Sequence, residues 1–332
     1  MKYISLFSGI GGFEVAIQKR WADAECLGYS EIKPSAIKVY EHHYPKHKNL
    51  GDITKITDEK ILELVKDGCD LIVGGFPCTN LSSIAAISGN YDGLDGPESG
   101  LFYELLRIIK VAQPKYIIIE NNNSMKKCNK KLITELFREI FPEIEMNMID
   151  ASDFGVQTRK RLYWTNFKIK DLPKECSQTW DDVLEPIDDV YNLRKSSKRI
   201  NGYNTKINRK NIKQKTRIMK LIENDTYEFV YTSCEKNEIS RWELCTISDN
   251  MHIQIYTPYP VGKSRPILAR DNLLIDRRTK PAFIFRKFSI KETERLFWFP
   301  DDYTSMVKQT HSEDLLGNTV VVKVIDYIIQ NI

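Results

Sequence analysis

Short apolar segments alternate with amphipathic segments through the first half of the sequence, and this alternation restricts the fold more than any other feature. Strands that are apolar on both faces and are joined by helices form parallel sheets. We expect strands at 3–7, 24–29, 71–73 and 116–119, helices at 13–20, 35–44 and 101–112, and a final strand pair within 146–169. The sequence therefore predicts an α/β fold with a doubly wound, mostly parallel sheet.

The pattern changes after about residue 173. Asn, Lys, Tyr and Thr predominate with weak periodicity as far as about residue 263, and helical patterns return at 289–297 and 318–329. A chain of 332 residues exceeds the usual size of one domain. We expect a first domain at 1–175, a smaller irregular domain at 176–288, and a C-terminal segment at 289–332 whose last helix packs back on the first domain.

The cysteines and the apolar segments exclude several classes of protein. The seven cysteines are scattered and form no CxxC pair, so neither a disulfide framework nor a zinc site is expected. The N-terminal sequence lacks the pattern of a signal peptide, and no segment is apolar over the length that crosses a bilayer. We expect a cytoplasmic protein with reduced thiols, no metal and no membrane partner.

A glycine-rich segment, FSGIGG at 7–12, lies between the first predicted strand and the first predicted helix. Its glycines let the backbone turn tightly and admit a ligand close to the main chain. The segment matches neither GxGxxG nor a Walker loop. Glu31 follows the second strand, where it could accept the ribose hydroxyls of a nucleoside, and Asp52, after the next strand, could accept an adenine amine. This predicts an adenosine site without pyrophosphate; the alternative is a glycine turn with two solvated carboxylates.

Two further clusters follow strands of the predicted sheet. GGFPCTNLS at 74–82 holds Cys78 in a glycine–proline loop, and IIIENNN at 117–123 leads from a strand into Glu120. Ligands of doubly wound sheets bind at the carboxyl ends of the strands, so both side chains are expected to face one cleft. A thiolate there is a strong nucleophile, and a carboxyl group can protonate a ring nitrogen. Considered singly, Cys78 could be a buried thiol and Glu120 a helix-capping acid.

Basic side chains are concentrated in two places. In QTRKR at 157–161, Arg159 and Arg161 alternate and project to one side of an extended segment, where paired guanidinium groups suit a phosphate or a carbonyl oxygen, unless this is a solvated edge. The segment 194–220 contains eleven Lys and Arg and no acid, although the net charge of the chain is only +4. Such a run favours binding to a phosphate backbone, or is a solvated loop or a localisation signal.

The clusters and their order resemble the cytosine C5-methyltransferases. The match runs through FSGIGGFE, Glu31, GDI, FPCTNLS, ENN and QTRKR, and continues with KETERLFWFPDDY at 291–303 and GNTVVVKVI at 317–325. PCTNLS, RLYWTN and SRPILA are also similar to the catalytic domain of the animal de novo DNA methyltransferases. The chain departs from the family pattern at Thr79, Asn122 and Trp298, where the family has Gln, Val and Gly.

The resemblance implies residue roles in a Rossmann-like catalytic domain that binds S-adenosylmethionine and a recognition domain that reads duplex DNA around a flipped base. Cys78 would attack carbon 6 of cytosine, Glu120 would act on ring nitrogen 3, Arg161 would hold the carbonyl oxygen, and Arg159 would hold the loop or the backbone. The cofactor residues would be Phe7, Ser8, Gly9, Gly11, Gly12, Glu31, Ile32, Asp52, Ile53, Pro77, Leu101, Asn318 and Val320. The DNA contacts would be Ser82, Gln157, Arg194, Lys195, Lys198, Arg199, Arg209 and Lys210.

The expected function is methyl transfer to carbon 5 of a cytosine in a specific site of double-stranded DNA. We expect a monomer that acts alone or beside a cognate restriction endonuclease, on a site that the sequence does not disclose beyond a CpG-like guess. The alternatives are a transfer RNA methyltransferase and a non-catalytic DNA-binding relative. A well-populated recognition domain favours DNA over RNA, and the presence of all the catalytic candidates argues against a relative that has lost activity.

Overall fold

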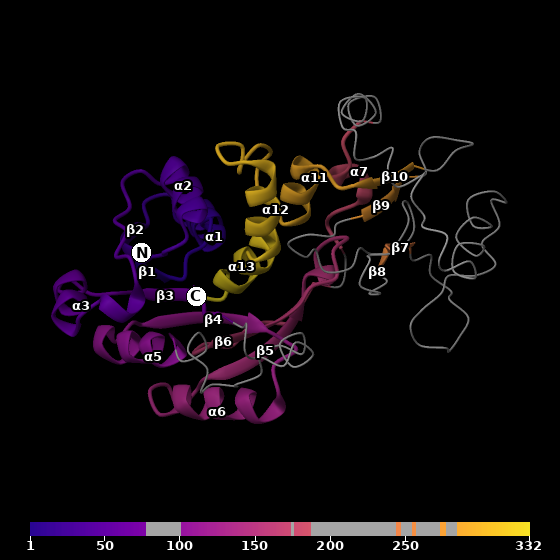
Figure 1. The fold of residues 1–332 in the computed structure, drawn as a ribbon. Helices are drawn as coiled ribbons and strands as arrows, with labels where there is room; N and C mark the ends of the chain where they lie inside the picture. Colours follow the sequence, from indigo (N-terminus) through magenta and orange to yellow (C-terminus); the bar gives the residue numbers. More distant parts are fainter. Residues whose placement is uncertain (78–100, 174–175, 187–243, 247–253, 257–272, 277–283) are drawn as a thin grey trace, which may run out of the picture.

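A six-stranded sheet forms the centre of the computed structural model, which describes residues 1–77, 101–173, 176–186, 244–246, 254–256, 273–276 and 284–332 (Figure 1). The strands are β1 Lys2–Leu6, β2 Glu25–Ser30, β3 Leu71–Gly75, β4 Tyr116–Asn122, β5 Glu145–Asp150 and β6 Lys160–Thr165, in the order β2-β1-β3-β4-β6-β5. β1 is parallel to β2 and β3, and β3 to β4, whereas β6 is antiparallel to β4 and β5. The predicted mostly parallel sheet is confirmed.

The helices connect these strands and follow them. They are α1 Gly12–Arg20, α2 Pro34–His43, α3 Asp58–Leu64, α5 Leu101–Ala112, α6 Lys127–Arg138, α7 Trp180–Val183, α11 Ile290–Leu296, α12 Gln309–Gly317 and α13 Val322–Ile329, with short 3-10 turns at Ile53–Lys55 and Ala151–Asp153. Two antiparallel strand pairs complete the described elements: β7 Leu244–Thr246 with β8 Gln254–Tyr256, and β9 Leu273–Asp276 with β10 Ile284–Lys287.

Both faces of the sheet are covered, as expected of a doubly wound fold. Neighbouring residues of a strand face opposite cores: Tyr3 and Val73 pack with residues of α1 and α13, whereas Ile4 and Ile72 pack with residues of α3, α5 and α6. Figure 1 shows α1 and α13 on one side of the sheet and α5 and α6 on the other. The carboxyl ends of β1 to β4 therefore lie along a single edge, between two packed helical layers.

The C-terminal segment returns to the N-terminal helix. α13 packs on α1, and the Lys19 ammonium lies 3.1 Å from the buried carboxylate of Asp326. The Tyr303 hydroxyl donates to the carbonyl of Ile10 at 2.8 Å, which fixes the chain after β1 from the far end of the sequence. The domain limits at 175 and 288 stay predictions, because most of the segment between them lies outside the described residues.

Two sequence-based expectations about elements were wrong. The segment between α2 and Asp52 forms no strand. It makes only a single bridge, between Asn49 and Tyr29, because Gly51 then turns the chain with φ 74°. The helix expected from residue 318 begins at Val322, because α12 continues to Gly317 and the carbonyls of Gly317 and Thr319 accept hydrogen bonds from the Arg159 guanidinium. None of the described helices is long and apolar enough to cross a membrane.

Candidate active site

The loop after β1 adopts the conformations that its glycines allow. Phe7, Gly9 and Gly11 have positive φ angles of 54°, 58° and 89°. A Cβ atom at Gly11 would lie 2.7 Å from the ring of Tyr44, so no larger residue fits there. A Cβ atom at Gly9 would meet nothing within 4 Å. The main chain at Gly9 therefore borders open space that a ligand can enter.

Glu31 faces this loop. One carboxylate oxygen accepts the backbone N–H of Gly9 at 2.9 Å, and the other accepts those of Ile32 and Lys33, each at 2.8 Å. β2 ends at Ser30, so the carboxylate stands just past the strand and bridges the first two strand–helix loops. The structure thus brings together the two parts of the predicted adenosine site.

Asp52 lies in the next loop along the same edge. Its carboxylate accepts the backbone N–H and the hydroxyl of Thr54, and these hydrogen bonds lower its pKa. The loop is tied to the end of β2 because the Ser30 hydroxyl donates to the carbonyl of Gly51 at 2.7 Å. Ile53 is buried, whereas Ile32 exposes 67% of its surface. An exposed isoleucine beside two carboxylates provides an apolar surface at this site.

The remaining predicted cofactor residues differ in their positions. A Cβ atom at Gly12 would lie 2.7 Å from the side chain of Val320, so the C-terminal segment closes over the glycine loop. Asn318 is exposed and its amide donates to the carbonyl of Asp314 at 2.8 Å. Ser8 is buried, and its hydroxyl has no hydrogen-bond partner among the described residues. Phe7 and Leu101 pack on one core cluster, and Pro77 is half-buried.

Glu120 and Arg161 form an ion pair at the carboxyl end of β4. The Arg161 Nε lies 3.1 Å from a carboxylate oxygen of Glu120, and the side chains are only 16% and 15% exposed. Glu120 stands opposite Tyr163 across the β4–β6 ladder and opposite Gly75 across the β3–β4 ladder. A Cβ atom at Gly75 would lie 2.8 Å from the second carboxylate oxygen, so the glycine provides the room that this carboxyl group occupies.

The surroundings of Glu120 favour its protonated form. Burial raises its pKa, and the nearby guanidinium groups of Arg161 and Arg159 oppose that rise without cancelling it. A carboxyl group with a raised pKa keeps its proton to higher pH than usual. The site therefore places a carboxyl group of raised pKa beside a fixed positive charge.

Arg159 is buried and connects this site to the C-terminal segment. Its guanidinium donates to the carbonyls of Gly317 at 3.0 Å and Thr319 at 2.9 Å, and lies over the ring of Phe297 at 5.0 Å from the ring centre. The same segment carries Val320, which covers the glycine loop. Arg159 thereby links the Glu120 side of the cleft to the predicted cofactor side.

Asn121 is a functional candidate that the sequence analysis did not single out. Its amide donates to the carbonyl of Phe76 at 3.0 Å, and so holds the chain two residues before Cys78 against β4. Asn122, at the family's valine position, accepts the backbone N–H of Ser124 at 3.0 Å and stabilises the turn after β4. The three asparagines after Glu120 can be seen in the sequence, but only the fold shows which atoms their side-chain amides contact.

Several predicted residues are placed otherwise or not described. Gln157 is 1% exposed, and its amide atoms have no hydrogen-bond partner among the described residues, so it is not a surface contact in this structure. The predicted residues that lie outside the described ranges are Cys78, Ser82, Arg194, Lys195, Lys198, Arg199, Arg209 and Lys210. Within the described ranges, no group of three or more His, Cys, Asp or Glu side chains could hold a metal ion.

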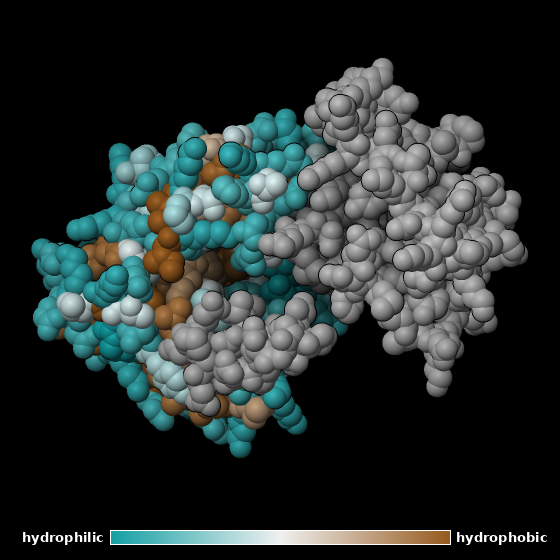
Figure 2. Space-filling view, viewed as in Figure 1, coloured by the Kyte–Doolittle hydropathy of each residue, from teal (hydrophilic) through white to brown (hydrophobic). Residues whose placement is uncertain are grey.

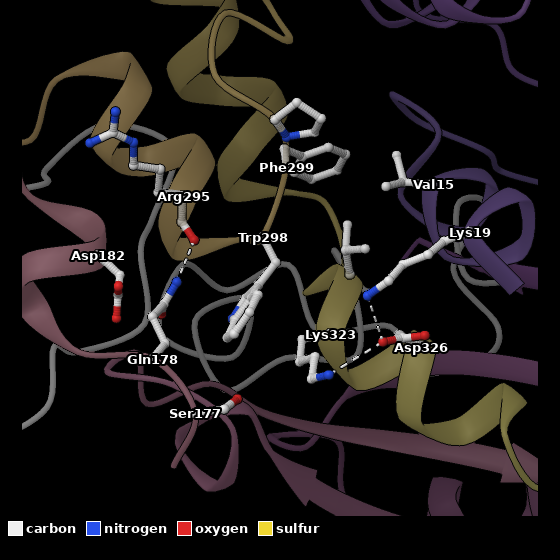
Figure 3. Close-up of a pocket in the computed structure, with 12 residues that line it drawn as sticks. Val15, Lys19, Ser177, Gln178, Asp182, Arg295, Trp298, Phe299, Lys323 and Asp326 are labelled. Carbon is white, nitrogen blue, oxygen red and sulfur yellow. Dashed lines mark hydrogen bonds and ion pairs between the residues drawn. The ribbon is translucent and has the colours of Figure 1, made fainter.

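A separate hollow of about 410 Å³ lies where α1, α11 and α13 meet the segment 177–182 (Figure 3). Trp298 lines it with φ 64°, a left-handed conformation at the position where the family pattern has glycine. The Lys323 ammonium lies 5.8 Å from the centre of the indole ring, and the Gln178 amide donates to the carbonyl of Arg295 at 2.8 Å. The tryptophan therefore keeps the backbone shape of the glycine while adding a side chain.

Solved structures with the same fold define the class. The chain matches a DNMT2 variant from Spodoptera frugiperda with a TM-score of 0.65 and 18% identity, covering 99% of this chain and 98% of that one. It matches the methyltransferase EhMeth of Entamoeba histolytica with a TM-score of 0.65 and 16% identity, covering 100% and 97%. The protein therefore has the α/β fold of the S-adenosylmethionine-dependent methyltransferases.

The family is defined by sequence. The model of the C-5 cytosine-specific DNA methylase family matches residues 1–332, and the chain belongs to that family. It is similar to the type II methyltransferase M.HhaI of Haemophilus parahaemolyticus, with 26% identity over 100% of this chain and 94% of that protein. The orphan methyltransferase M.Rho11sI of Bacillus phage rho11s is 33% identical over 49% of this chain, a match that spans 32% of the phage protein. The expected family is confirmed, and the protein is a methyltransferase of this family.

Proposed function

We propose that this protein transfers a methyl group from S-adenosylmethionine to carbon 5 of a cytosine that is flipped out of a specific site in duplex DNA. The observation that carries the proposal is the half-buried Glu120–Arg161 pair, which stands at the same sheet edge as the glycine loop. β3 ends at that edge with Gly75, and Cys78 follows three residues later in the sequence. A nucleophile, a proton donor and a nucleoside site would then share one cleft.

The residues present fit an adenosine-containing methyl donor. Open space at Gly9 would admit the ligand, Glu31 would accept the ribose hydroxyls, and Asp52 would accept the adenine amine. The exposed Ile32 would pack against the base. When bound, S-adenosylmethionine supplies an electrophilic methyl group on a sulfonium. Gly12 and Val320, which pack closely against each other, would close the pocket.

The chain's own residues would make cytosine reactive enough to accept the methyl group. Carbon 5 is a poor nucleophile in the intact ring. Attack of the Cys78 thiolate on carbon 6 would form a carbon–sulfur bond and move an electron pair toward carbon 5, while Glu120 donates its proton or a hydrogen bond to nitrogen 3. Arg161 would hold the carbonyl oxygen and stabilise charge that develops there. After carbon 5 has accepted the methyl group, a base would remove its proton and the thiolate would leave.

Duplex DNA is the proposed substrate because the relatives that match this chain end to end are named as type II methyltransferases. A stacked base cannot reach Cys78, so the nucleotide would be flipped out at a cost of a few kcal/mol. Phosphate contacts would offset that cost, and the basic run at 194–220 is one proposed source of them. A cognate endonuclease remains a proposal, since orphan methyltransferases are also among the relatives.

The test is methyl transfer from labelled S-adenosylmethionine to duplex DNA and, separately, to transfer RNA. We expect incorporation into DNA only, and no incorporation with the Cys78→Ser variant, which should still bind the cofactor with nearly unchanged affinity. DNA that carries 5-fluorocytosine should trap a covalent adduct with the wild-type protein, because fluorine blocks the final elimination. Incorporation into RNA alone would overturn the choice of substrate, and a failure to form the adduct during turnover would overturn the covalent route.

A further inference from the structure

Four lysines follow β4 directly beside the proposed active site. The segment 122–131, NNSMKKCNKK, contains Lys126, Lys127, Lys130 and Lys131 and no acidic residue. It forms the turn after β4 and the first turns of α6. Lys126, Lys127 and Lys131 are exposed, and Lys131 exposes 77% of its side chain. The segment is therefore a compact basic surface that begins two residues after Glu120.

The sheet register adds a fifth lysine to this surface. β6 runs antiparallel to β4, so its first residue, Lys160, lies at the same edge as the last residue of β4, and Arg161 stands opposite Asn122. Lys160 is exposed. The neighbouring acid at this edge, Asp150, accepts the backbone N–H groups of Ser152 and Arg159 and so is engaged by the main chain.

Lys126 and Lys127 stand at a helix end that does not favour cations. The first turn of α6 contains no acid, although acids are the residues that stabilise a helix N-terminus, and Lys126 and Lys127 stand there instead. The Lys130 ammonium donates to the carbonyl and the side-chain oxygen of Asn123, at 2.7 and 2.9 Å, and so shapes the turn itself. Lys131 pairs with Glu135 at 3.6 Å, whereas the Lys127 ammonium forms no ion pair with any acid in the part of the chain that the structure describes.

We infer that Lys126, Lys127, Lys130, Lys131 and Lys160, the β4-edge lysines, bind the phosphates of duplex DNA on either side of the flipped nucleotide. The inference rests on the proposed function, because it assumes that the target base enters the cleft at Glu120. A flipped nucleotide remains attached to its strand, so the flanking phosphates must pass the rim of that cleft. This rim is basic at the β4–β6 edge, and the β4-edge lysines would hold the strand there.

The experiment compares two variants with equal loss of charge. Lys127→Ala/Lys131→Ala removes two β4-edge lysines and keeps good helix formers in α6. Lys110→Ala/Lys115→Ala removes two exposed lysines at the end of α5 and just before β4, at the opposite edge of the sheet. The affinity for a fluorescein-labelled duplex is measured by anisotropy over a series of salt concentrations, with thermal unfolding as the control for folding.

We expect the β4-edge variant to bind DNA roughly tenfold more weakly at low salt and to lose about two units from the slope of log K against log salt, since each phosphate contact contributes about 0.9. The control variant should keep the wild-type slope. Equal slopes in both variants would overturn the inference, as would a change seen with a labelled RNA hairpin but not with DNA. If the wild type methylates DNA and the β4-edge variant binds normally, this inference fails alone; if the wild type does not methylate DNA, the proposed function fails.

Discussion

Glu14 is a charged residue type in a fully buried position. It lies in α1, just after the glycine loop, with no exposed surface. The Tyr40 hydroxyl donates to one carboxyl oxygen at 3.0 Å and also contacts the Nδ1 atom of His47 at 3.1 Å. The other oxygen has no hydrogen-bond partner among the described residues. Burial raises the pKa of this carboxyl group from 4.5 to about 7, against the opposing effect of its hydrogen bonds.

Replacement of Glu14 by Gln should therefore change how stability depends on pH. The native state holds the proton more tightly than the unfolded chain, so the wild type is most stable below about pH 4.5 and loses stability as the pH rises through about 7. The variant lacks this loss. Relative to the wild type, Glu14→Gln should gain on the order of 3 kcal/mol in free energy of unfolding across that window. Urea unfolding at several pH values measures this, and the exposed Glu25→Gln variant should show no such gain.

Trp298 provides a second test at the scale of a residue. A bulky side chain at φ 64° costs about 1–2 kcal/mol in backbone strain. Alanine at this position would keep the strain and lose the indole, whereas glycine would lose both. We expect Trp298→Gly to unfold with a free energy about 1 kcal/mol higher than Trp298→Ala. The usual order, with alanine more stable than glycine, should appear at Lys131 in α6. The same order at both positions would argue against strain at Trp298.

Adjacent glycines in β3 perform different tasks, which the sheet register separates. A Cβ atom at Gly74 would lie 2.6 Å from the backbone carbonyl of Leu6 in β1, and one at Gly75 would lie 2.8 Å from the carboxylate of Glu120 in β4. Backbone cannot move without separating the strands, whereas a side chain can rotate. Gly74 therefore permits close strand packing, and Gly75 leaves room for the Glu120 carboxyl group.

Alanine substitutions should separate stability from activity at these two positions. Gly74→Ala should lower the free energy of unfolding by about 1–3 kcal/mol, because two strands must move apart. Gly75→Ala should change stability much less but displace Glu120 and lower the rate of methyl transfer about tenfold or more. Denaturant unfolding and single-turnover methylation of both variants measure the two effects. A Gly75→Ala enzyme with the wild-type rate would mean that the position of this carboxyl group does not limit the reaction.

The sequence predicted elements according to how strongly their apolar pattern stood out. The strands β1 and β3 are short runs buried on both faces and could be located to within two residues. α6 was not predicted, because its first half is rich in lysine and shows no apolar pattern, and its buried positions Ile133 and Phe137 come only afterwards. The strand before Asp52 was predicted in error, since its residues form only one bridge. Local pattern therefore located the elements of the core better than those of the rim.

The chain as a whole is closed by contacts between its two ends. Phe13 and Ile17 of α1 share a core with Ile325 and Ile328 of α13, all of them almost or entirely buried. Gly12 also packs against Val320, so the glycine loop is completed from a position more than three hundred residues later in the sequence. The order of motifs in the sequence predicted that these segments belong to one family, but the contacts between them depend on the fold and could not be derived from spacing.

Removal of α13 should consequently unfold the protein. A chain that ends at Val321 would expose the core residues of α1, and the loss would exceed the 5–15 kcal/mol that stabilises a typical domain. A chain that ends at Gln330 loses the hydrogen bonds of Asn331 to Lys170, Tyr327 and Ile328 and the peripheral packing of Ile332, and should remain folded because α13 is kept. Circular dichroism and size-exclusion chromatography distinguish the two outcomes. A folded protein without α13 would show that the contact between the ends contributes little.

The sequence motifs predicted which residues lie in the site, but they did not predict the contacts that hold those residues in place. Glu31 was expected near the glycine loop, and its carboxylate accepts the N–H of Gly9. The contact between Asn121 and the carbonyl of Phe76, and the space that Gly75 leaves for Glu120, arise from strand pairing and have no signature in the sequence. Family motifs identify residue types, whereas hydrogen bonds between neighbouring strands determine how those residues are held.

The hydrogen bonds from Arg159 to the carbonyls of Gly317 and Thr319 have a consequence for biosynthesis. While the chain is still being translated, residues 1–165 can leave the ribosome before residues 317–320 have been added. During that interval the glycine loop lacks its cover and the arginine lacks these two acceptors. A nascent polypeptide would thus lack the closed glycine loop until its final helices have been added.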